Sequence, residues 1–467
     1  MADKQYDVVI IGGGTGGYVA AIRAAQLGLK AAVVDKSKVG GTCLHQGCIP
    51  TKALLHTAEL LDTFRHHQEF GLTGEVGLDY AGALAKKDRV VNQLYRGVQG
   101  LLKKNKVDVL DGFGRLSAAN QVEVTAEDGS KTSVLAKDIV LATGSVPRAL
   151  PKLQFDGKRI INSDHVLTMA EVPQSVLILG GGAIGVEFAS MYNDFGSSVT
   201  LVEMLPHILP QDDQEIAAQL TRLMTRRGIK VHAGATFMLD QVKVGKKGVS
   251  GVIQTSDGKE SPVEGEVLLV AVGRQPVSEG LGLETLGVAV DRGFVKVDDH
   301  YRTNVPHVYA IGDLIGGYLL AHVAAHEGMI AVETIAGKEP ELLSADRIPR
   351  VTYSRPEVAS VGWTKEEAEQ HGRTVKVGTF PFKANGRSLI LGEAEGMVKL
   401  VADAKTDALL GAHIVGPNAS EMINEMALAR FLEGTAWEIA ESVHAHPTVS
   451  EVLHEAALAV DGHAIHI

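Results

Sequence analysis

The chain has 467 residues, of which 45% are hydrophobic and 52 are glycine, and its formal net charge is −11. This length is typical of about three domains, and the negative charge disfavours a nucleic acid partner because such binding depends on basic patches. Apolar runs stay well below the roughly 20 residues that span a bilayer, and the first residues carry no basic leader or cleavage site. We therefore expect a cytoplasmic protein without membrane contact.

The first element is a nucleotide-binding pattern. Residues 8–11 are an apolar run that predicts a buried parallel strand, and the glycine-rich turn at 12–17 opens a helix. A second strand at 31–34 ends at Asp35. Glycines of this kind let the backbone approach a pyrophosphate, the helix N-terminus receives its charge, and the acid bonds a ribose hydroxyl.

Both cysteines of the chain follow in the segment 40–52. Gly40 to Thr42 are typical of a helix start, where the helix dipole lowers thiol pKa values, and Lys52 shares a helix face with Cys48. Five helical steps rise about 7.5 Å, more than the roughly 6.8 Å that a disulfide spans between Cα atoms. The segment must therefore be locally unwound when oxidised, which Gly47 and Pro50 allow.

The cysteine pair has other possible interpretations. Isolated cysteines are often small buried hydrophobes. A zinc site needs two further ligands, and His45 alone does not supply them. In a compartment where thiols stay reduced, a close pair beside a nucleotide motif favours a redox-active disulfide.

The chain contains an internal duplication. Residues 53–102 read largely as helix, and a strand at 138–141 leads to Thr143 and Gly144. The pattern then repeats as an apolar run at 176–179, glycines at 180–185, an acid at Glu203, and a closing strand at 267–270. One such motif could be glycines that merely make turns, but two copies in the same context indicate two dinucleotide sites.

The last third of the chain has a different order of predicted strands and helices. A short strand near residues 309–313 ends in Asp313 and predicts a return to the first nucleotide site. After residue 349, strands at 375–382 and 397–401 alternate with helices near 421–432 and 450–460. This pattern predicts a separate α+β domain.

Taken together, these motifs resemble the pyridine nucleotide-disulfide oxidoreductases over essentially the whole chain. The resemblance implies an α/β fold with two Rossmann-like dinucleotide-binding domains and a C-terminal α+β dimerisation domain. It implies an FAD-binding domain at 1–148, an NAD-binding domain at 149–275, a central segment at 276–346 that returns to the FAD site, and an interface domain at 347–467. The matching segments are GGTCLHQGCIPTK at 40–52, ATG at 142–144, AVGR at 271–274, AIGD at 310–313, LAH at 320–322, YSRPEV at 353–358 and HAHPTVSE at 444–451, together with both glycine motifs.

The resemblance also implies residue roles. Cys48 would face the flavin ring, and Cys43 would exchange with substrate. Lys52 would lie near flavin N5, paired with Glu187. His446, oriented by Glu451, would be the acid/base of the partner subunit's site, although a metal site or a surface pair with His444 is the alternative. The implied cofactor-binding residues are Gly12, Gly14, Gly17, Asp35, Lys36, Gly41, Thr42, Lys52, Gly114, Thr143, Gly144, Ser145, Asp313, Ala321, Gly180, Gly182, Gly185, Glu187, Glu203, Gly273 and Arg274.

The implied reaction is oxidation of a protein-bound dihydrolipoyl dithiol by NAD through the disulfide and FAD. The implied partners are a second copy of the chain in a homodimer, the lipoyl domain of an acyltransferase or a glycine cleavage carrier protein, and the subunit-binding domain of a 2-oxo acid dehydrogenase complex.

Three alternatives fit less well. A mercuric reductase would carry a cysteine pair in its C-terminal tail, and residues 460–467 have none. Glutathione-type reductases use NADPH and place basic residues after the second acid, where this chain has residues 204–206, Met-Leu-Pro. A non-catalytic scaffold needs no cysteine pair. Four positions depart from the family pattern: Asp35, His45, Thr51 and Arg355. We expect His45 to tune the thiol pKa values and Asp35 to alter FAD affinity.

Overall fold

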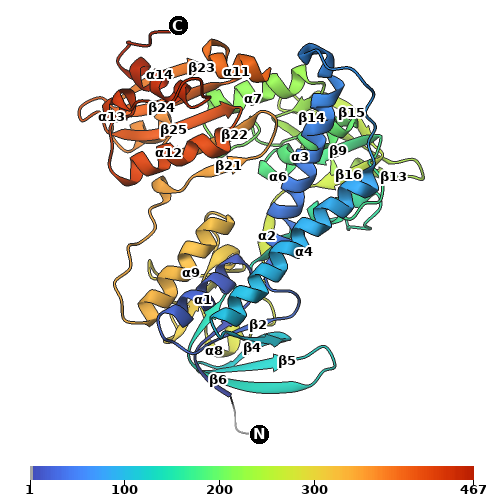
Figure 1. Cartoon of the computed structure of the whole chain (residues 1–467). Helices are drawn as coiled ribbons and strands as arrows, with labels where there is room; N and C mark the ends of the chain where they lie inside the picture. Colours follow the sequence, from blue (N-terminus) through green and yellow to red (C-terminus); the bar gives the residue numbers. More distant parts are fainter. Residues whose placement is uncertain (1–3) are drawn as a thin grey trace. The chain divides into compact units, whose positions relative to one another are not determined.

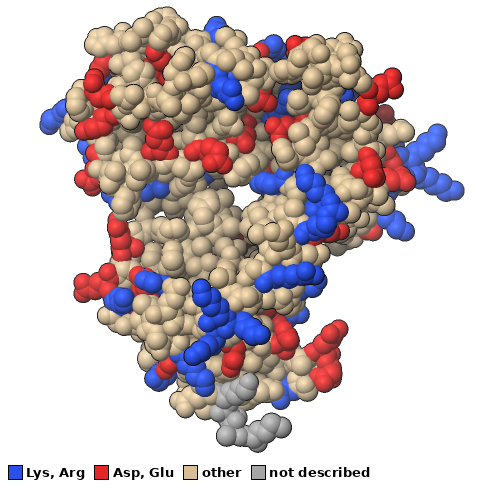
Figure 2. Space-filling view, in the orientation of Figure 1, with Lys and Arg blue, Asp and Glu red and all other residues tan. Residues whose placement is uncertain are grey.

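The computed structural model describes residues 4–467, and these residues divide into two compact units. The first unit comprises residues up to 53, 82–148 and 274–343, and the second comprises 54–81, 149–273 and 344–467. Within the described residues, no helix combines the length and apolar character needed to cross a membrane. Basic and acidic side chains are interspersed on the face that Figure 2 shows.

A mixed sheet organises the first unit. Its strands lie in the order β3-β2-β1-β6-β5-β4, and β20 pairs with β6; Figure 1 labels β2, β4, β5 and β6 of this sheet. Residues 8–11 of β1 pair in parallel with 31–34 of β2. Helices α1 and α9 cover one face of these strands, and residues of β4, β5 and α8 pack against the other face. The bounds are β1 Lys4–Ile11, β2 Ala31–Asp35, β3 Asp108–Asp111, β4 Phe113–Ala118, β5 Gln121–Thr125, β6 Lys131–Leu141, β20 Val308–Ala310, α1 Thr15–Gln26, α2 Gly41–Gln46, α8 Leu283–Leu286 and α9 Ala321–Ile335.

Small strand pairs complete this unit. Strand β7 pairs with β17, and β18 pairs with β19. A 3-10 turn, η3, follows β20 directly and carries Asp313. The bounds are β7 Ser145–Pro147, β17 Arg274–Pro276, β18 Val290–Asp291, β19 Phe294–Val295 and η3 Gly312–Leu314.

Two long helices account for most of the region predicted as helix at 53–102. Helix α3 (Cys48–Arg65) begins with a cysteine, and its residues from Leu54 onward belong to the second unit. Helix α4 (Tyr80–Lys104) belongs to the first unit from Gly82 onward. Between them lies the short turn η1 (His67–Phe70), and residues 71–79 form no helix.

A parallel sheet in the second unit repeats the strand-turn-helix pattern. Its strands lie in the order β11-β10-β9-β16-β8, and helix α6 follows the glycine turn after β9. An antiparallel sheet of β12 to β15 is attached to it. The bounds are β8 Ile160–Ile161, α5 Ser163–Val166, β9 Ser175–Leu179, α6 Ala183–Phe195, β10 Ser198–Val202, α7 Gln214–Arg226, β11 Lys230–His232, β12 Ala235–Phe237, η2 Leu239–Gln241, β13 Lys243–Val244, β14 Val249–Thr255, β15 Glu260–Gly265 and β16 Val267–Val270.

The C-terminal part of this unit is an antiparallel sheet in the order β21-β22-β25-β24-β23. Helices α12, α13 and α14 share one apolar core with this sheet. The predicted fold class is therefore confirmed, whereas the predicted domain boundaries stay predictions. The bounds are η4 Ala345–Arg347, β21 Arg350–Thr352, β22 Glu357–Gly362, α10 Lys365–Gln370, β23 Val375–Pro381, η5 Phe382–Ala384, α11 Gly386–Leu391, β24 Met397–Asp403, β25 Leu409–Gly416, α12 Ala419–Phe431, α13 Ala436–Glu441 and α14 Glu451–Val460.

Candidate active site

The first glycine turn has no room for a side chain at Gly12 or Gly17. Gly12 has φ +109°, and a Cβ there would lie 2.2 Å from the carbonyl oxygen of Ala142. A Cβ at Gly17 would lie 1.8 Å from the carbonyl oxygen of Gly12. Asp35 Oδ2 accepts the N–H of Gly13 at 2.6 Å. The turn is thus held between strand ends and presents bare backbone at the start of α1.

The second turn repeats this geometry. Gly180 has φ +104°, and its Cβ would lie 2.3 Å from the carbonyl oxygen of Ala271. A Cβ at Gly185 would lie 1.8 Å from the carbonyl oxygen of Gly180. Glu203 Oε2 accepts the N–H of Gly181 at 2.6 Å. Two glycine turns with the same geometry fit two dinucleotides, because each places exposed backbone N–H groups and a helix N-terminus where they can bind a pyrophosphate.

The local unwinding predicted between the cysteines occurs at Gly47. Helix α2 ends at Gln46, Gly47 has φ −144° and ψ −113°, and α3 begins at Cys48. A Cβ at Gly47 would lie 3.0 Å from the carbonyl oxygen of Thr42. Upstream, a Cβ at Gly41 would lie 2.5 Å from Cα of Gly14. The segment with the cysteines is therefore packed directly on the first glycine turn.

Cys43 and Cys48 are in contact as thiols. Their side chains are hydrogen-bonded to each other, and the hydroxyl of Thr15 is bonded to Cys43. The hydrogen bond with Cys48 and burial raise the pKa of Cys43, while Thr15 and the charge of Lys52 lower it by less. Thr15 was missed by the sequence analysis, although it is the residue after the third glycine of the first motif.

His45, one of the departures from the family pattern, contacts the loop before α2 and helix α4, and its effect on the thiol pKa values stays a prediction. Its Nε2 lies 3.0 Å from the carbonyl oxygen of Val39, and its ring packs edge-on against Tyr95, with ring centroids 5.2 Å apart. His45 therefore ties α2 to the preceding loop and to helix α4. This contact with α4 has no signal in the local sequence.

Asp313 lies in a polar cluster on the first unit. The hydroxyl of Ser145 donates to Asp313 Oδ2, and Arg274 donates through Nε to the Ser145 hydroxyl at 2.6 Å. Arg274 Nε is also 3.6 Å from Asp313 Oδ2. Thr143 donates its hydroxyl to the carbonyl oxygen of Val277 at 2.6 Å. The structure thus brings together four residues predicted for cofactor binding, from three separate stretches of chain.

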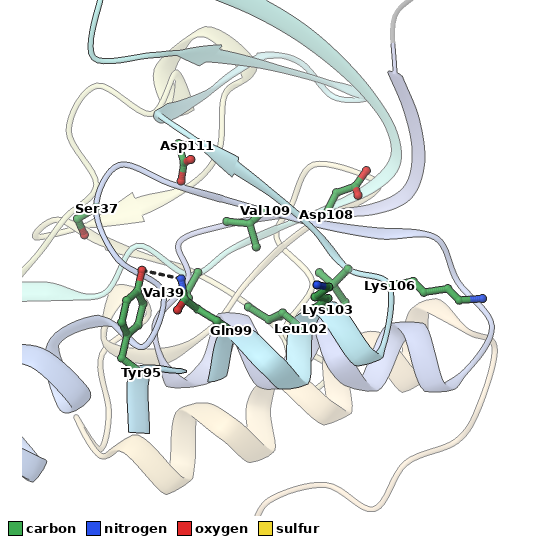
Figure 3. Close-up of a pocket in the computed structure, with 11 residues that line it drawn as sticks. Ser37, Val39, Tyr95, Gln99, Leu102, Lys103, Lys106, Asp108, Val109 and Asp111 are labelled. Atoms are coloured by element: carbon green, nitrogen blue, oxygen red, sulfur yellow. Dashed lines mark hydrogen bonds between the residues drawn. The ribbon is translucent and has the colours of Figure 1, made fainter. Parts of the chain in front are cut away.

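A cavity of about 510 Å³ adjoins the strand ends of β2 and β3. Figure 3 shows residues of α4, including Tyr95 and Gln99, on one side and residues of β3 on the other. Asp111 lines this cavity and is the register partner of Asp35. The cavity is therefore beside the acid expected to bind an adenosine ribose. Its lining is Ser37, Val39, Tyr95, Gln99, Leu102, Lys103, Lys106, Val107, Asp108, Val109 and Asp111.

The remaining predicted residues of the first unit are placed as follows. Lys36 is exposed next to Asp35, and Ala321 is the first residue of α9. Gly144 has φ +70°. Gly114 is buried in β4, where a Cβ would lie 2.9 Å from Ile11, and its role in cofactor binding stays a prediction.

Glu187 and Glu203 are both buried in the second unit. Glu187 Oε1 accepts the N–H of Tyr353 at 3.0 Å. Glu203 Oε1 accepts the N–H of Leu205 at 2.7 Å. Gly182 directly precedes α6. A Cβ added at Gly182 or at Gly273 would have no neighbouring atom within 4 Å. The predicted pairing of Lys52 with Glu187 stays a prediction.

His446 and Glu451 are brought together as expected. His446 Nδ1 is 2.9 Å from Glu451 Oε1, and Glu451 Oε2 accepts the N–H of Thr448 at 2.8 Å. Burial opposes ionisation of Glu451, but the hydrogen bonds from Thr448 and His446 outweigh it and lower the pKa of this carboxyl. His444 Nε2 pairs separately with Glu425 at 3.0 Å. A cavity of about 820 Å³, lined in part by residues 447–450, borders this segment.

The second half of α3 is held by an ion-pair cluster that the sequence analysis missed. Arg65 donates to the carbonyl oxygen of Asp194 at 2.6 Å, and Arg355 donates to Asp62 Oδ2 at 2.7 Å. Arg227 pairs with Asp194 and lies 3.6 Å from Asp62. Burial raises the pKa of Asp194 to about 6. Arg355, one of the departures from the family pattern, thus anchors the helix that begins with Cys48.

Comparison with known proteins agrees with this geometry. Residues 6–328 match the family described as pyridine nucleotide-disulphide oxidoreductase, and residues 348–457 match its dimerisation domain. A dihydrolipoyl dehydrogenase of Bacillus subtilis is 47% identical, covering 99% of each chain, and that of Zymomonas mobilis is 45% identical, covering both chains completely. The crystal structure of LpdA from Mycobacterium tuberculosis has a TM-score of 0.89 and 29% identity, covering 97% of this chain and 99% of that one. With both family segments matched and both glycine cradles in place, the chain belongs to the pyridine nucleotide-disulphide oxidoreductase family.

Proposed function

We propose that this chain is a dihydrolipoyl dehydrogenase that oxidises a protein-bound dihydrolipoyl group and reduces NAD. The observation that carries the proposal is the contact between Cys43 and Cys48 at the start of α3, packed on the first glycine turn. Full-length relatives at about 45% identity bear this enzyme's name. The enzyme is a homodimer through its dimerisation domain, and its cofactors are FAD and NAD, as in its family.

The cysteines carry the exchange with substrate. In the oxidised enzyme, the first substrate thiolate attacks Sγ of Cys43, the Cys43–Cys48 bond breaks, and Cys48 leaves as a thiolate. The second substrate thiol loses its proton and attacks its neighbouring sulfur in the mixed disulfide. The bond to Cys43 then breaks, Cys43 keeps the electron pair, and the lipoyl disulfide closes. The enzyme now holds two more electrons than before.

The raised pKa of Cys43 fits this order. Cys43 takes a proton as it leaves, because its hydrogen bond with Cys48 and its burial raise the pKa of its thiol. Bound FAD supplies the two-electron chemistry by which these electrons reach NAD as a hydride. On the protein side, Gly12, Gly14 and Gly17 admit the pyrophosphate of FAD, and Asp35 binds its ribose. Asp313, Ser145 and Ala321 would contribute further contacts to FAD.

His446 accepts the proton of the second substrate thiol. Imidazole suits this role because its ordinary pKa lies near 6.5, and Glu451 holds the ring through Nδ1. In the homodimer, His446 of one protomer serves the cysteines of the other. Glu203 and the second glycine turn select NAD, because a 2′-phosphate would meet a buried carboxylate.

The partners follow from the substrate. The dithiol is carried on a lipoyl domain of an acyltransferase or on a glycine cleavage carrier protein, and the subunit-binding domain of a 2-oxo acid dehydrogenase complex binds the dimer. A cytoplasmic location suits this chemistry, because a reducing compartment keeps stray thiols from forming disulfides.

The direct test is an anaerobic titration of the purified dimer with NADH, followed by lipoamide or glutathione disulfide. We expect a long-wavelength absorption band from the thiolate and flavin after two electrons, and rapid reoxidation by lipoamide alone. Rapid turnover with glutathione disulfide would assign a different flavin disulfide reductase. Reduction without the band would contradict the role of Cys48.

A further inference from the structure

Glu327 is a buried carboxyl that the mechanism above does not use. It lies in the second turn of α9 and is 6% exposed. Its Oε2 accepts the N–H of Gly312 at 2.6 Å. Gly312 has φ +70° and is the residue before Asp313. One side chain of α9 therefore holds the turn that presents Asp313.

The position of α9 is itself fixed at this point. A Cβ at Gly328 would lie 2.7 Å from the carbonyl oxygen of Gly16 in α1. A Cβ at Gly16 would in turn lie 2.9 Å from the carbonyl oxygen of Ala324. Because the two helices meet backbone to backbone beside Glu327, its carboxylate has little freedom to move away from Gly312.

The surroundings of Glu327 disfavour its charge. Asp313 on η3 and Tyr301 are the titratable groups that face it. The one charged residue of α1, Arg23, pairs instead with Glu333 at 2.5 Å. Among the ion pairs of residues 4–467, none involves Glu327. Burial raises the pKa of Glu327 to about 7, the N–H of Gly312 opposes the rise, and Asp313 adds to it.

We propose that Glu327 is a positioning residue for the flavin cofactor, which sets the Gly312–Asp313 turn and makes FAD affinity depend on pH around neutrality. The inference rests on the proposed role of Asp313 in holding FAD. An ionised carboxylate accepts a stronger hydrogen bond from Gly312 than a neutral one does. Protonation therefore loosens the turn, and FAD is held more weakly at lower pH.

The test is FAD release from the full-length dimeric holoenzyme on dilution, followed by flavin fluorescence between pH 5.5 and 8.5. We expect the dissociation constant of the unsubstituted enzyme to rise about fivefold from pH 8 to pH 6. In Glu327→Gln, the amide oxygen still accepts from Gly312, so the constant should be independent of pH and close to the value that the unsubstituted enzyme reaches at pH 6. Glu327→Ala leaves the buried N–H without an acceptor, and affinity should fall at least about tenfold below that of the glutamine variant.

Glu333→Gln is the matched control, because Glu333 lies on the same helix and its partner is Arg23. It should keep the pH profile of the unsubstituted enzyme. A pH-dependent profile in Glu327→Gln, or a flat one in the unsubstituted enzyme, would overturn the proposal even if Glu327→Ala fails to fold. Two other results would count against the proposed function instead. The purified dimer would hold no stoichiometric FAD at any pH, or it would bind FAD with unaltered affinity and yet fail to oxidise dihydrolipoamide.

Discussion

Nδ1 of His446 lies 2.9 Å from Oε1 of Glu451, yet the imidazole side chain is 80% exposed while the carboxylate is only 27% exposed. Glu451 thus orients the imidazole ring through Nδ1, and the rest of the ring is exposed to solvent. Within the described residues, Nε2 of His446 has no hydrogen-bonding partner. An oriented but uncovered histidine on a dimerisation domain is what a site completed by a second subunit requires.

Mixed dimers test this arrangement. His446→Ala should lower turnover by roughly 10²- to 10⁴-fold, the usual contribution of a general acid/base. When it is mixed with Cys48→Ser protein under subunit exchange, each heterodimer should regain one working site, because one protomer keeps the cysteines and the other keeps the histidine. Activity is measured against the heterodimer fraction from native mass spectrometry. Heterodimers without activity would mean that His446 acts within its own chain or not at all.

Glu203 should decide between NAD and NADP. Its two oxygens already accept N–H groups of Gly181 and Leu205, so the carboxylate is fixed where a 2′-phosphate would repel it. We expect a preference for NADH over NADPH of at least about a hundredfold in kcat/KM, a difference of about 2.7 kcal/mol. Glu203→Gln should narrow this ratio. Equal efficiency with the two cofactors in the unsubstituted enzyme would refute the assignment.

The glycine turns could be predicted from the sequence because their cause is local. Gly12 and Gly180 occupy the same place in two copies of one pattern, and each has a positive φ and a carbonyl at the position of a Cβ. The break at Gly47 follows in the same way from the five-residue offset of two cysteines. Local backbone geometry restricts the residue types at these positions, so the residue types predict the geometry.

The long-range polar contacts could not be predicted. Asp62 and Arg355 are 293 positions apart. Arg355 departs from the family pattern, but nothing in the sequence identifies Asp62 as its partner. The contacts of His45 with Val39 and Tyr95 likewise have no signal in the local sequence. In the sequence, Glu327 is one polar residue of a helix. Its hydrogen bond with the N–H of Gly312 is visible only in the folded structure. The hydrogen-bond and ion-pair partners of these residues depend on the fold of the whole chain, and the local sequence pattern does not predict them.

The pair of Lys399 and Asp213 should be important for stability. Lys399 Nζ is 2.8 Å from Asp213 Oδ2, and the two side chains are 6% and 1% exposed. Lys399→Met would leave a buried carboxylate without its cation and should cost about 3–5 kcal/mol in the free energy of unfolding. Urea denaturation measures this cost.

The double variant Lys399→Met with Asp213→Asn should recover part of this loss. The asparagine is neutral, and its side-chain oxygen can still cap α7, as Asp213 does through Glu215 and Ile216. Lys365, whose partner Glu369 is 3.9 Å away on the surface, is the control, and Lys365→Met should change stability by less than about 0.5 kcal/mol. A double variant less stable than Lys399→Met alone would show that the buried charge is not the cause.

His444 should make stability depend on pH. Its hydrogen bond with Glu425 raises the pKa of the imidazole in the folded chain. A raised folded pKa stabilises the protein fully below the unfolded pKa of about 6.5, and this stabilisation is lost as pH rises through the folded pKa. The melting temperature of His444→Gln should therefore differ most from that of the unsubstituted enzyme near pH 5.5 and least above pH 8. A constant difference across this range would exclude titration of His444 as the source.

The central claim is that Cys43 and Cys48 form the redox disulfide beside the flavin. The most direct measurement is the rate of NAD reduction by dihydrolipoamide in purified Cys48→Ser enzyme, with its FAD content determined in parallel. We predict FAD at full stoichiometry and turnover reduced to background, because no thiolate remains to face the flavin. Dihydrolipoamide oxidation at the unsubstituted rate in that variant would contradict the account.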